Sequence, residues 1–80
     1  MYKTDINNNI YYYDNFSRLH REDGPAIIID NGDKCWYFEN KQHRTDGPAV
    51  IVGKSKYYYI MGKEYSYEYW LVIKDFSLLW

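Results

Sequence analysis

A seven-residue motif occurs twice in this chain, and the repetition restricts the fold more than any other feature. His20–Ala26 reads H-R-E-D-G-P-A, and His43–Ala49 reads H-R-T-D-G-P-A. The period of the repeat is therefore the 23 residues from position 20 to position 43. A repeat this short corresponds to one supersecondary unit, which buries its apolar surface only against neighbouring copies. We therefore expect one repeat domain covering residues 1–80 rather than two domains with separate cores.

Each copy of the repeat contains two runs that are typical of β-strands. Ala26–Ile29 and Lys34–Phe38 are rich in β-branched and aromatic residues, and they flank the polar turn Asp30–Asp33. The same order in the other copies predicts strands over Ile10–Tyr13, Ala49–Val52 and Tyr57–Met61. The sequence therefore predicts a mainly β fold, an antiparallel meander of about three β-hairpins over residues 2–17, 18–41 and 42–63.

The end of the chain departs from the repeat. A third motif would begin near residue 66, but Ser66 and the residues after it read S-Y-E-Y-W-L-V-I-K. Ser66 is a good helix N-cap, and Glu68 suits the positive end of the helix dipole. We expect a helix over Tyr67–Lys74, and we assign residues 66–80 to this capping helix and a tail.

The motif supplies the polar residues that stand out as a possible site. They are His20, Arg21, Asp23, Gly24, His43, Arg44, Asp46 and Gly47. The favoured interpretation is structural, with Arg21 reaching Asp46, or Arg44 reaching Asp23, across neighbouring loops. A metal site on the two histidines, or acid–base catalysis, is the alternative, but no companion nucleophile or metal-ligand spacing supports it. We expect neither an enzyme nor a bound cofactor or metal.

Tyrosine and tryptophan carry the second hypothesis, because the chain is 21% aromatic and contains eleven tyrosines. Side chains alternate between the faces of a sheet, so aligning the copies at the spacing of the two motifs places one set of aromatic residues on a common face. The candidate protein-binding residues of this face are Tyr11, Tyr13, Trp36, Tyr57 and Tyr59. One short helix covers only one face, which leaves an aromatic surface for a partner; the alternative is a sheet that curls over its own side chains.

The C-terminal residues are too apolar for an isolated tail. Phe76, Leu78, Leu79 and Trp80 either fold back onto the sheet or take part in self-association as a homodimer.

Charge and composition exclude several classes of function. Ten basic and eleven acidic residues give a net charge of −1, which argues against a phosphate-neutralising nucleic-acid binder. Cys35 is the only cysteine, so the chain cannot form an internal disulfide. We find no run of about 20 apolar residues that would span a membrane. These features together predict a cytoplasmic protein.

The repeat resembles the MORN-like repeat proteins of phages and large DNA viruses. His20–Ala26 and His43–Ala49 carry the resemblance, and Gly32, Trp36 and Tyr59 support it. It covers about residues 18–73 and implies a β-hairpin array. It also implies a phage or viral source, with the host cytoplasm as the location, but no established activity.

Three hypotheses for function follow. The first is a non-enzymatic protein-interaction module, and in a virus such a protein would bind and inhibit a host factor, for example a defence protein. The second is a nucleotide or single-stranded nucleic-acid binder that stacks bases on the tyrosines beside Lys34, Lys41, Lys54 and Lys56. The third is a His/Asp metal-dependent hydrolase. We favour the first hypothesis.

Overall fold

The structure, a computed structural model, describes residues 1–76. These residues form nine strands and one helix: β1 (Tyr2–Thr4), β2 (Ile10–Tyr12), β3 (Ile27–Ile28), β4 (Lys34–Cys35), β5 (Tyr37–Phe38), β6 (Lys41–Gln42), β7 (Val50–Val52), β8 (Ser55–Ile60), β9 (Lys63–Tyr65) and α1 (Tyr67–Ile73). All strand pairs are antiparallel. The mainly β meander that ends in a helix is therefore confirmed.

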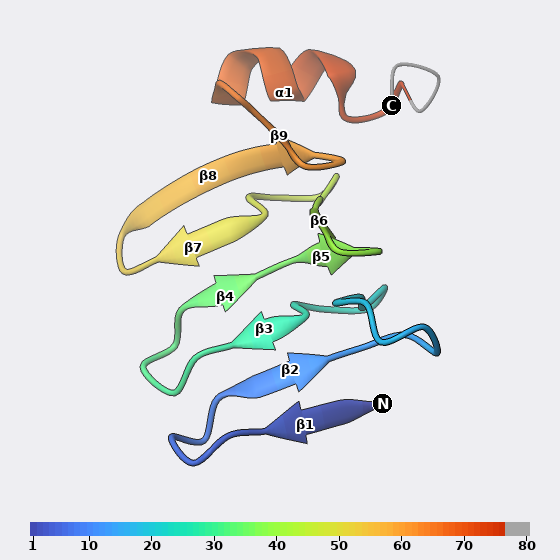
Figure 1. The fold of residues 1–80 in the computed structure, drawn as a ribbon. Coiled ribbons are helices and arrows are strands. Elements are labelled where there is room, and N and C mark those ends of the chain that lie inside the picture. The colour runs from blue at the N-terminus through green and yellow to red at the C-terminus, as the bar shows by residue number, and fades with distance from the viewer. Residues whose placement is uncertain (77–80) are drawn as a thin grey trace.

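Seven of these strands form one sheet in the order β1-β2-β3-β4-β7-β8-β9. Figure 1 shows the strands following one another from the N-terminus upward, with α1 beyond β9 at the far end of the sheet. The Cα atoms extend over 39 × 31 × 17 Å, which is the shape of a slab. The motif loops lie between the hairpins, at one end of the strands.

Small side hairpins, which the sequence analysis missed, extend the repeat. β5 and β6 pair across a turn at Glu39 and Asn40, and β8 and β9 pair across a turn at Met61 and Gly62. All four turn residues have positive φ, between 47° and 89°. Asn40 and Gly62 adopt this conformation readily, but Glu39 and Met61 seldom do, so the local sequence carries only half of the usual turn signal.

The repeat distance differs between the two sides of each hairpin. The Ala26 N–H donates to the Cys35 carbonyl, and the Ala49 N–H donates to the Tyr57 carbonyl. Cys35 and Tyr57 are one position closer together in the sequence than Ala26 and Ala49 are. The cause is the shorter turn of the third unit, at Gly53 and Lys54. Trp36 therefore corresponds to Tyr58, and the expected alignment of Trp36 with Tyr59 is wrong by one position.

The first unit shows the same kind of offset. The Tyr12 N–H donates to the Ala26 carbonyl, as the Trp36 N–H donates to the Ala49 carbonyl. Tyr12, Trp36 and Tyr58 are thus equivalent positions, and so are the residues that follow them, Tyr13, Tyr37 and Tyr59.

The helix α1 closes the sheet at its C-terminal end. The Ser66 hydroxyl accepts the Tyr69 N–H at 3.2 Å, which caps the helix as predicted, and Lys74 is the C-cap. Trp70 and Ile73 are buried with Ile60 of β8 in one hydrophobic cluster. Since Ala26 and Ala49 are the only fully covered motif residues, at 0% exposure, the core is small and spread along the array.

Candidate functional site

Each motif arginine places its guanidinium group over an aromatic ring of the sheet. The Arg44 guanidinium carbon is 3.7 Å from the centroid of the Trp36 ring, a close cation–π contact. Its Nε donates to Asp46 Oδ1 at 2.8 Å, and its NH1 donates to the Pro48 carbonyl at 3.0 Å. Stacking and hydrogen bonding together fix this planar group in one orientation.

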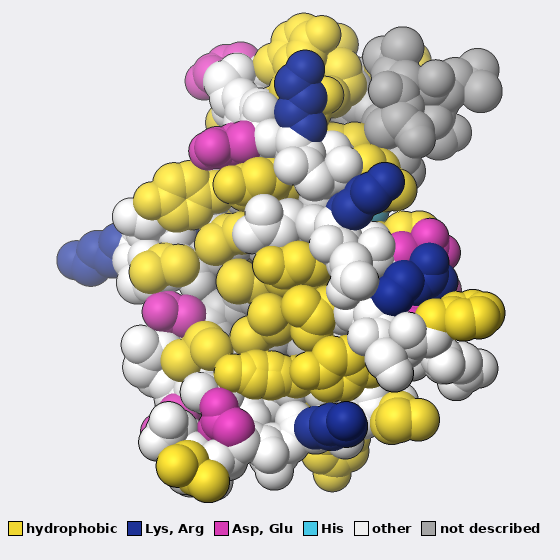
Figure 2. Space-filling model, in the orientation of Figure 1, with side chains coloured by type: hydrophobic (Ala, Val, Ile, Leu, Met, Phe, Trp, Pro, Cys, Tyr) yellow, Lys and Arg dark blue, Asp and Glu magenta, His cyan; other side chains and the backbone are white. Residues whose placement is uncertain are grey.

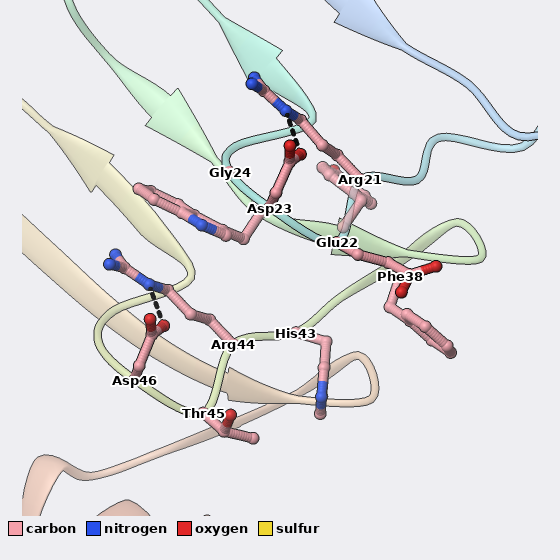
Figure 3. A pocket seen from close by; sticks show the side chains of 11 residues that line it. Arg21, Glu22, Asp23, Gly24, Phe38, His43, Arg44, Thr45 and Asp46 are labelled. Atoms are coloured by element: carbon pink, nitrogen blue, oxygen red, sulfur yellow. Dashed lines mark hydrogen bonds and ion pairs between the residues drawn. The ribbon is translucent and has the colours of Figure 1, made fainter. Parts of the chain in front are cut away.

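The first motif repeats this arrangement. The Arg21 guanidinium carbon is 3.9 Å from the Tyr12 ring centroid, and its Nε donates to Asp23 Oδ1 at 3.0 Å. Figure 3 shows the two ion pairs, each closed within its own loop. The expected pairing across loops, Arg21 with Asp46 or Arg44 with Asp23, is therefore wrong. The tight Asp-Gly-Pro turn brings each aspartate back to the arginine of its own motif.

The motif glycines leave room for these guanidinium groups. A Cβ placed on Gly47 would stand 2.7 Å from the Arg44 guanidinium carbon, and one on Gly24 would stand 3.0 Å from that of Arg21. Real Cβ atoms essentially never come within 3.0 Å of another heavy atom. A side chain at Gly47 would force the Arg44 guanidinium to shift, and one at Gly24 would push that of Arg21 by a few tenths of an ångström.

The motif histidines join each loop to the neighbouring side hairpin. Nδ1 of His20 accepts the Glu39 N–H at 3.1 Å, and Nδ1 of His43 accepts the Met61 N–H at 3.0 Å. Phe38 packs against both imidazoles, with ring centroids 4.7 Å from His20 and 6.0 Å from His43. Burial lowers the pKa of His43, which favours the neutral imidazole that this acceptor role requires.

The third unit replaces the motif arginine with a helix residue. The Trp70 ring lies 4.8 Å from that of Tyr58, centroid to centroid, and its Nε1 donates to the Arg44 carbonyl at 3.0 Å. One face of the sheet thus carries Tyr12, Trp36 and Tyr58, each covered by a side chain of the same chain. We call it the motif face. The eight motif residues named from the sequence build this face and its loops.

A groove of about 580 Å³ lies between the two motif loops (Figure 3). The aspartates at its edge, Asp23 and Asp46, have side chains 87% and 83% exposed, but their ion pairs with arginine lower the pKa of both carboxyls. Within residues 1–76, no group of three or more His, Cys, Asp or Glu side chains is placed to hold a metal ion. The groove therefore shows polar groups that are already engaged within each loop.

The opposite face carries the remaining tyrosines. Strand pairing places Tyr11 opposite Ile27, Ile27 opposite Cys35, Cys35 opposite Val50 and Val50 opposite Tyr57, so these side chains form one row across the sheet. Two positions further along the chain from Tyr11, Cys35 and Tyr57, the residues Tyr13, Tyr37 of β5 and Tyr59 form a second row on the same side, because alternate residues of an extended chain share a face. We call these two rows the tyrosine face. Figure 2 shows it as a band of hydrophobic side chains running across the strands.

The tyrosine face is only partly buried. Tyr57 is 40% exposed, Val50 is 9% exposed, and the other members of the two rows lie between buried and exposed. Partial burial is the first cause of a raised pKa for the hydroxyl of Tyr37, and nearby Cys35 and Tyr59 add to it. Within residues 1–76, neither a helix nor a second layer of sheet covers this band (Figure 2).

Four of the five predicted protein-binding residues share this face. Tyr11, Tyr13, Tyr57 and Tyr59 lie on it, whereas Trp36 lies beneath Arg44 on the motif face. The sequence analysis named Trp36 where it should have named Tyr37, because a register error of one position moves a side chain to the other face. The spacing between tyrosines could have identified Tyr37. The spacing from Tyr13 to Tyr37 is one position longer than that between the two motifs, and the spacing from Tyr37 to Tyr59 is one position shorter.

Charged residues are distributed unequally over the two faces. Lys3 lies opposite Tyr11, and Glu64 lies opposite Tyr59, so both are on the tyrosine face at its two ends. Lys34 on β4 and Lys56 on β8 are the two cross-strand partners of Ile51, and all three lie on the motif face. Two of the four lysines that base stacking would need are therefore on the wrong side of the sheet for it.

The candidate self-association segment is described only in part. The Phe76 side chain is 54% exposed, while Leu78, Leu79 and Trp80 lie outside the described residues. In residues 1–76, no helix has the length and apolar character needed to cross a membrane.

Comparison of the chain with protein-family models, with curated proteins and with solved structures finds no match. The resemblance to MORN-like repeat proteins therefore rests on the two motif copies, and the function has to be argued from the geometry of the two faces.

Proposed function

We propose that this chain is a non-enzymatic protein-interaction module and that the tyrosine face is its binding surface. The observation that carries the proposal is the contrast between the faces. On the motif face, arginines lie over Tyr12 and Trp36 and Trp70 of α1 packs on Tyr58, while the described residues place no second layer on the tyrosine face.

Elementary packing supports this proposal. A sheet with an apolar face normally buries it against another layer, and large apolar patches that stay exposed tend to be interaction sites. Tyrosine is enriched at protein interfaces because it combines a large contact area with a polar hydroxyl. Tyr13, Tyr37 and Tyr59 supply three such side chains to the same face, with Leu19 opposite Tyr13 and Gln42 opposite Tyr37.

The resemblance to phage and viral repeat proteins supports a narrower form of the proposal. In that form the partner is a host protein, and binding inhibits it, as an anti-defence protein would. The geometry of the tyrosine face bears only on the broader form.

The test is a capture experiment with two matched double variants. Tyr57→Ser/Tyr59→Ser removes two tyrosines from the tyrosine face. Tyr2→Ser/Tyr69→Ser removes two that lie off it and are 61% and 55% exposed. Each tagged chain is incubated with host lysate to which an untagged wild-type copy has been added, and the bound proteins are quantified by mass spectrometry.

We expect the first double variant to lose about 90% of a specifically captured protein, since central interface aromatics each contribute about 2 kcal/mol or more to binding. The second should capture as much as wild type. Circular dichroism establishes that both remain folded. Equal capture by both folded variants would overturn the proposal.

A further inference from the structure

The tyrosine face has the size and outline of a half-sandwich. The chain is 17 Å thick and 39 × 31 Å across, whereas two packed sheets lie about 10 Å apart with side chains interdigitated between them. A partner in an interface of standard size contributes about 800 Å². The broad side of this slab is large enough to supply that area.

Two opposite charges stand at opposite ends of the same tyrosine row. Lys3 lies on β1, and its Nζ leans over the Tyr13 ring, 5.6 Å from the centroid. Glu64 lies on β9 directly opposite Tyr59. Tyr13 and Tyr59 are the two ends of the row that has Tyr37 at its centre. The face therefore runs from a positive end, through three tyrosines, to a negative end.

This order is self-complementary under one particular twofold rotation. An axis parallel to the strands reverses the strand order, so that β1 of one copy lies over β9 of the other. Lys3 then meets Glu64 of the second copy, and Tyr37 meets its own equivalent near the axis. The perpendicular axis would instead place Lys3 on Lys3.

We propose that the occupant of the tyrosine face is a second copy of this chain, packed face to face as a C2 β-sandwich with two Lys3–Glu64 pairs at its rim. This inference rests on the proposed function, since it names the partner of the same surface. Isologous dimers of this kind are the commonest oligomers, and their interfaces are more apolar than the rest of the surface.

Sedimentation of charge-reversed variants tests this arrangement. Lys3→Glu and Glu64→Lys each create two like-charge pairs per dimer, and we expect each to raise the dimer dissociation constant about tenfold or more. An equimolar mixture of the two variants forms a heterodimer in which both pairs again join opposite charges, one of them with its sign reversed. That mixture should recover a dissociation constant within about threefold of wild type.

Two further variants separate the interface from general effects of charge. Lys54→Glu makes the same charge change in the β7–β8 turn, away from the row, and should leave the dissociation constant within about twofold. Tyr37→Ser, at the centre of the row, should weaken the dimer about thirtyfold. Circular dichroism is used to verify that each variant is folded.

The outcomes separate this inference from the proposed function. A wild-type chain that stays monomeric at about 100 µM, or a mixture that does not recover, overturns the dimer. If the tyrosine variants nevertheless lose a different captured protein, the interaction module stands with another partner. If Tyr37→Ser and Tyr57→Ser/Tyr59→Ser change neither sedimentation nor capture, both proposals fail.

Discussion

Both faces of the sheet carry a row of aromatic residues, but the rows differ in whether other side chains of the described residues lie over the rings. On the motif face, Trp36 is covered by Arg44, and its equivalent Tyr58 is covered by Trp70. On the tyrosine face, Tyr37 and Tyr59 are the next residues along the chain, and the described residues provide no layer over them. The contrast teaches that the repeated motif stabilises one side of the sheet only.

The largest loss of stability is expected from removing Trp70, the helix residue that packs on the motif face. Trp70→Ala removes a side chain that is 4% exposed, together with its ring contact and its hydrogen bond to the Arg44 carbonyl. We expect the free energy of unfolding to fall by about 3–5 kcal/mol, measured by urea denaturation. Tyr69→Ala, on an exposed side of the helix, should cost less than about 1 kcal/mol. Similar losses for both would show that Trp70 does not close the motif face.

A smaller loss of stability is expected when Arg44 is replaced by lysine, which keeps the charge but lacks the planar guanidinium group. Lys at position 44 cannot stack a planar group on Trp36 while donating to both Asp46 and Pro48. Arg44→Lys should lower the free energy of unfolding, measured by urea denaturation, by about 1–2 kcal/mol. Lys54→Arg, in an exposed turn, is the matched reverse substitution and should be nearly neutral. An unchanged Arg44→Lys variant would mean that charge alone holds the loop.

The junction between the second motif and the last side hairpin should depend on pH. Burial holds the pKa of His43 below its usual 6.5. Above that pH both folded and unfolded chains carry a neutral imidazole, so the stability is complete. As the pH falls below 6.5, the unfolded chain binds a proton before the folded chain does, and the free energy of unfolding decreases.

His43→Asn isolates this effect, because the asparagine Oδ1 can still accept the Met61 N–H but does not titrate. Thermal unfolding between about pH 7.5 and 5 should show a decline for wild type that is weaker in the variant. The Asp46 carboxyl has a pKa below its usual 3.8 and loses its contribution only at lower pH. Identical pH profiles for the two proteins would refute the assignment to His43.

The smallest effect on stability is expected from the tyrosine face itself. Tyr57 is 40% exposed, so Tyr57→Ser should change the unfolding free energy by less than about 1 kcal/mol when measured in dilute solution. A loss comparable to that of Trp70→Ala would mean that Tyr57 belongs to the core, and the contrast between the faces would then disappear.

The loops and the helix were predictable because their signals are local. Gly47 makes space for Arg44 within the same loop, and Ser66 caps the helix that begins beside it. The two motif copies therefore marked the ends of the hairpins, and the missing third copy marked the helix. The Glu39–Asn40 turn escaped prediction because Glu39 seldom adopts a positive φ, and the hydrogen bond from its N–H to His20 Nδ1 joins residues far apart in the sequence.

The sequence by itself determined an antiparallel array of hairpins, because strand patterns, turn residues and a capping serine all act over a few neighbouring positions. The tertiary structure decided which face each aromatic residue occupies. That assignment depends on the register between strands, and a turn shorter by one position reverses it for every residue that follows. Trp36 supports Arg44, whereas Tyr37, the next residue, lies on the opposite face because successive side chains alternate, and residues 1–76 place no layer over it.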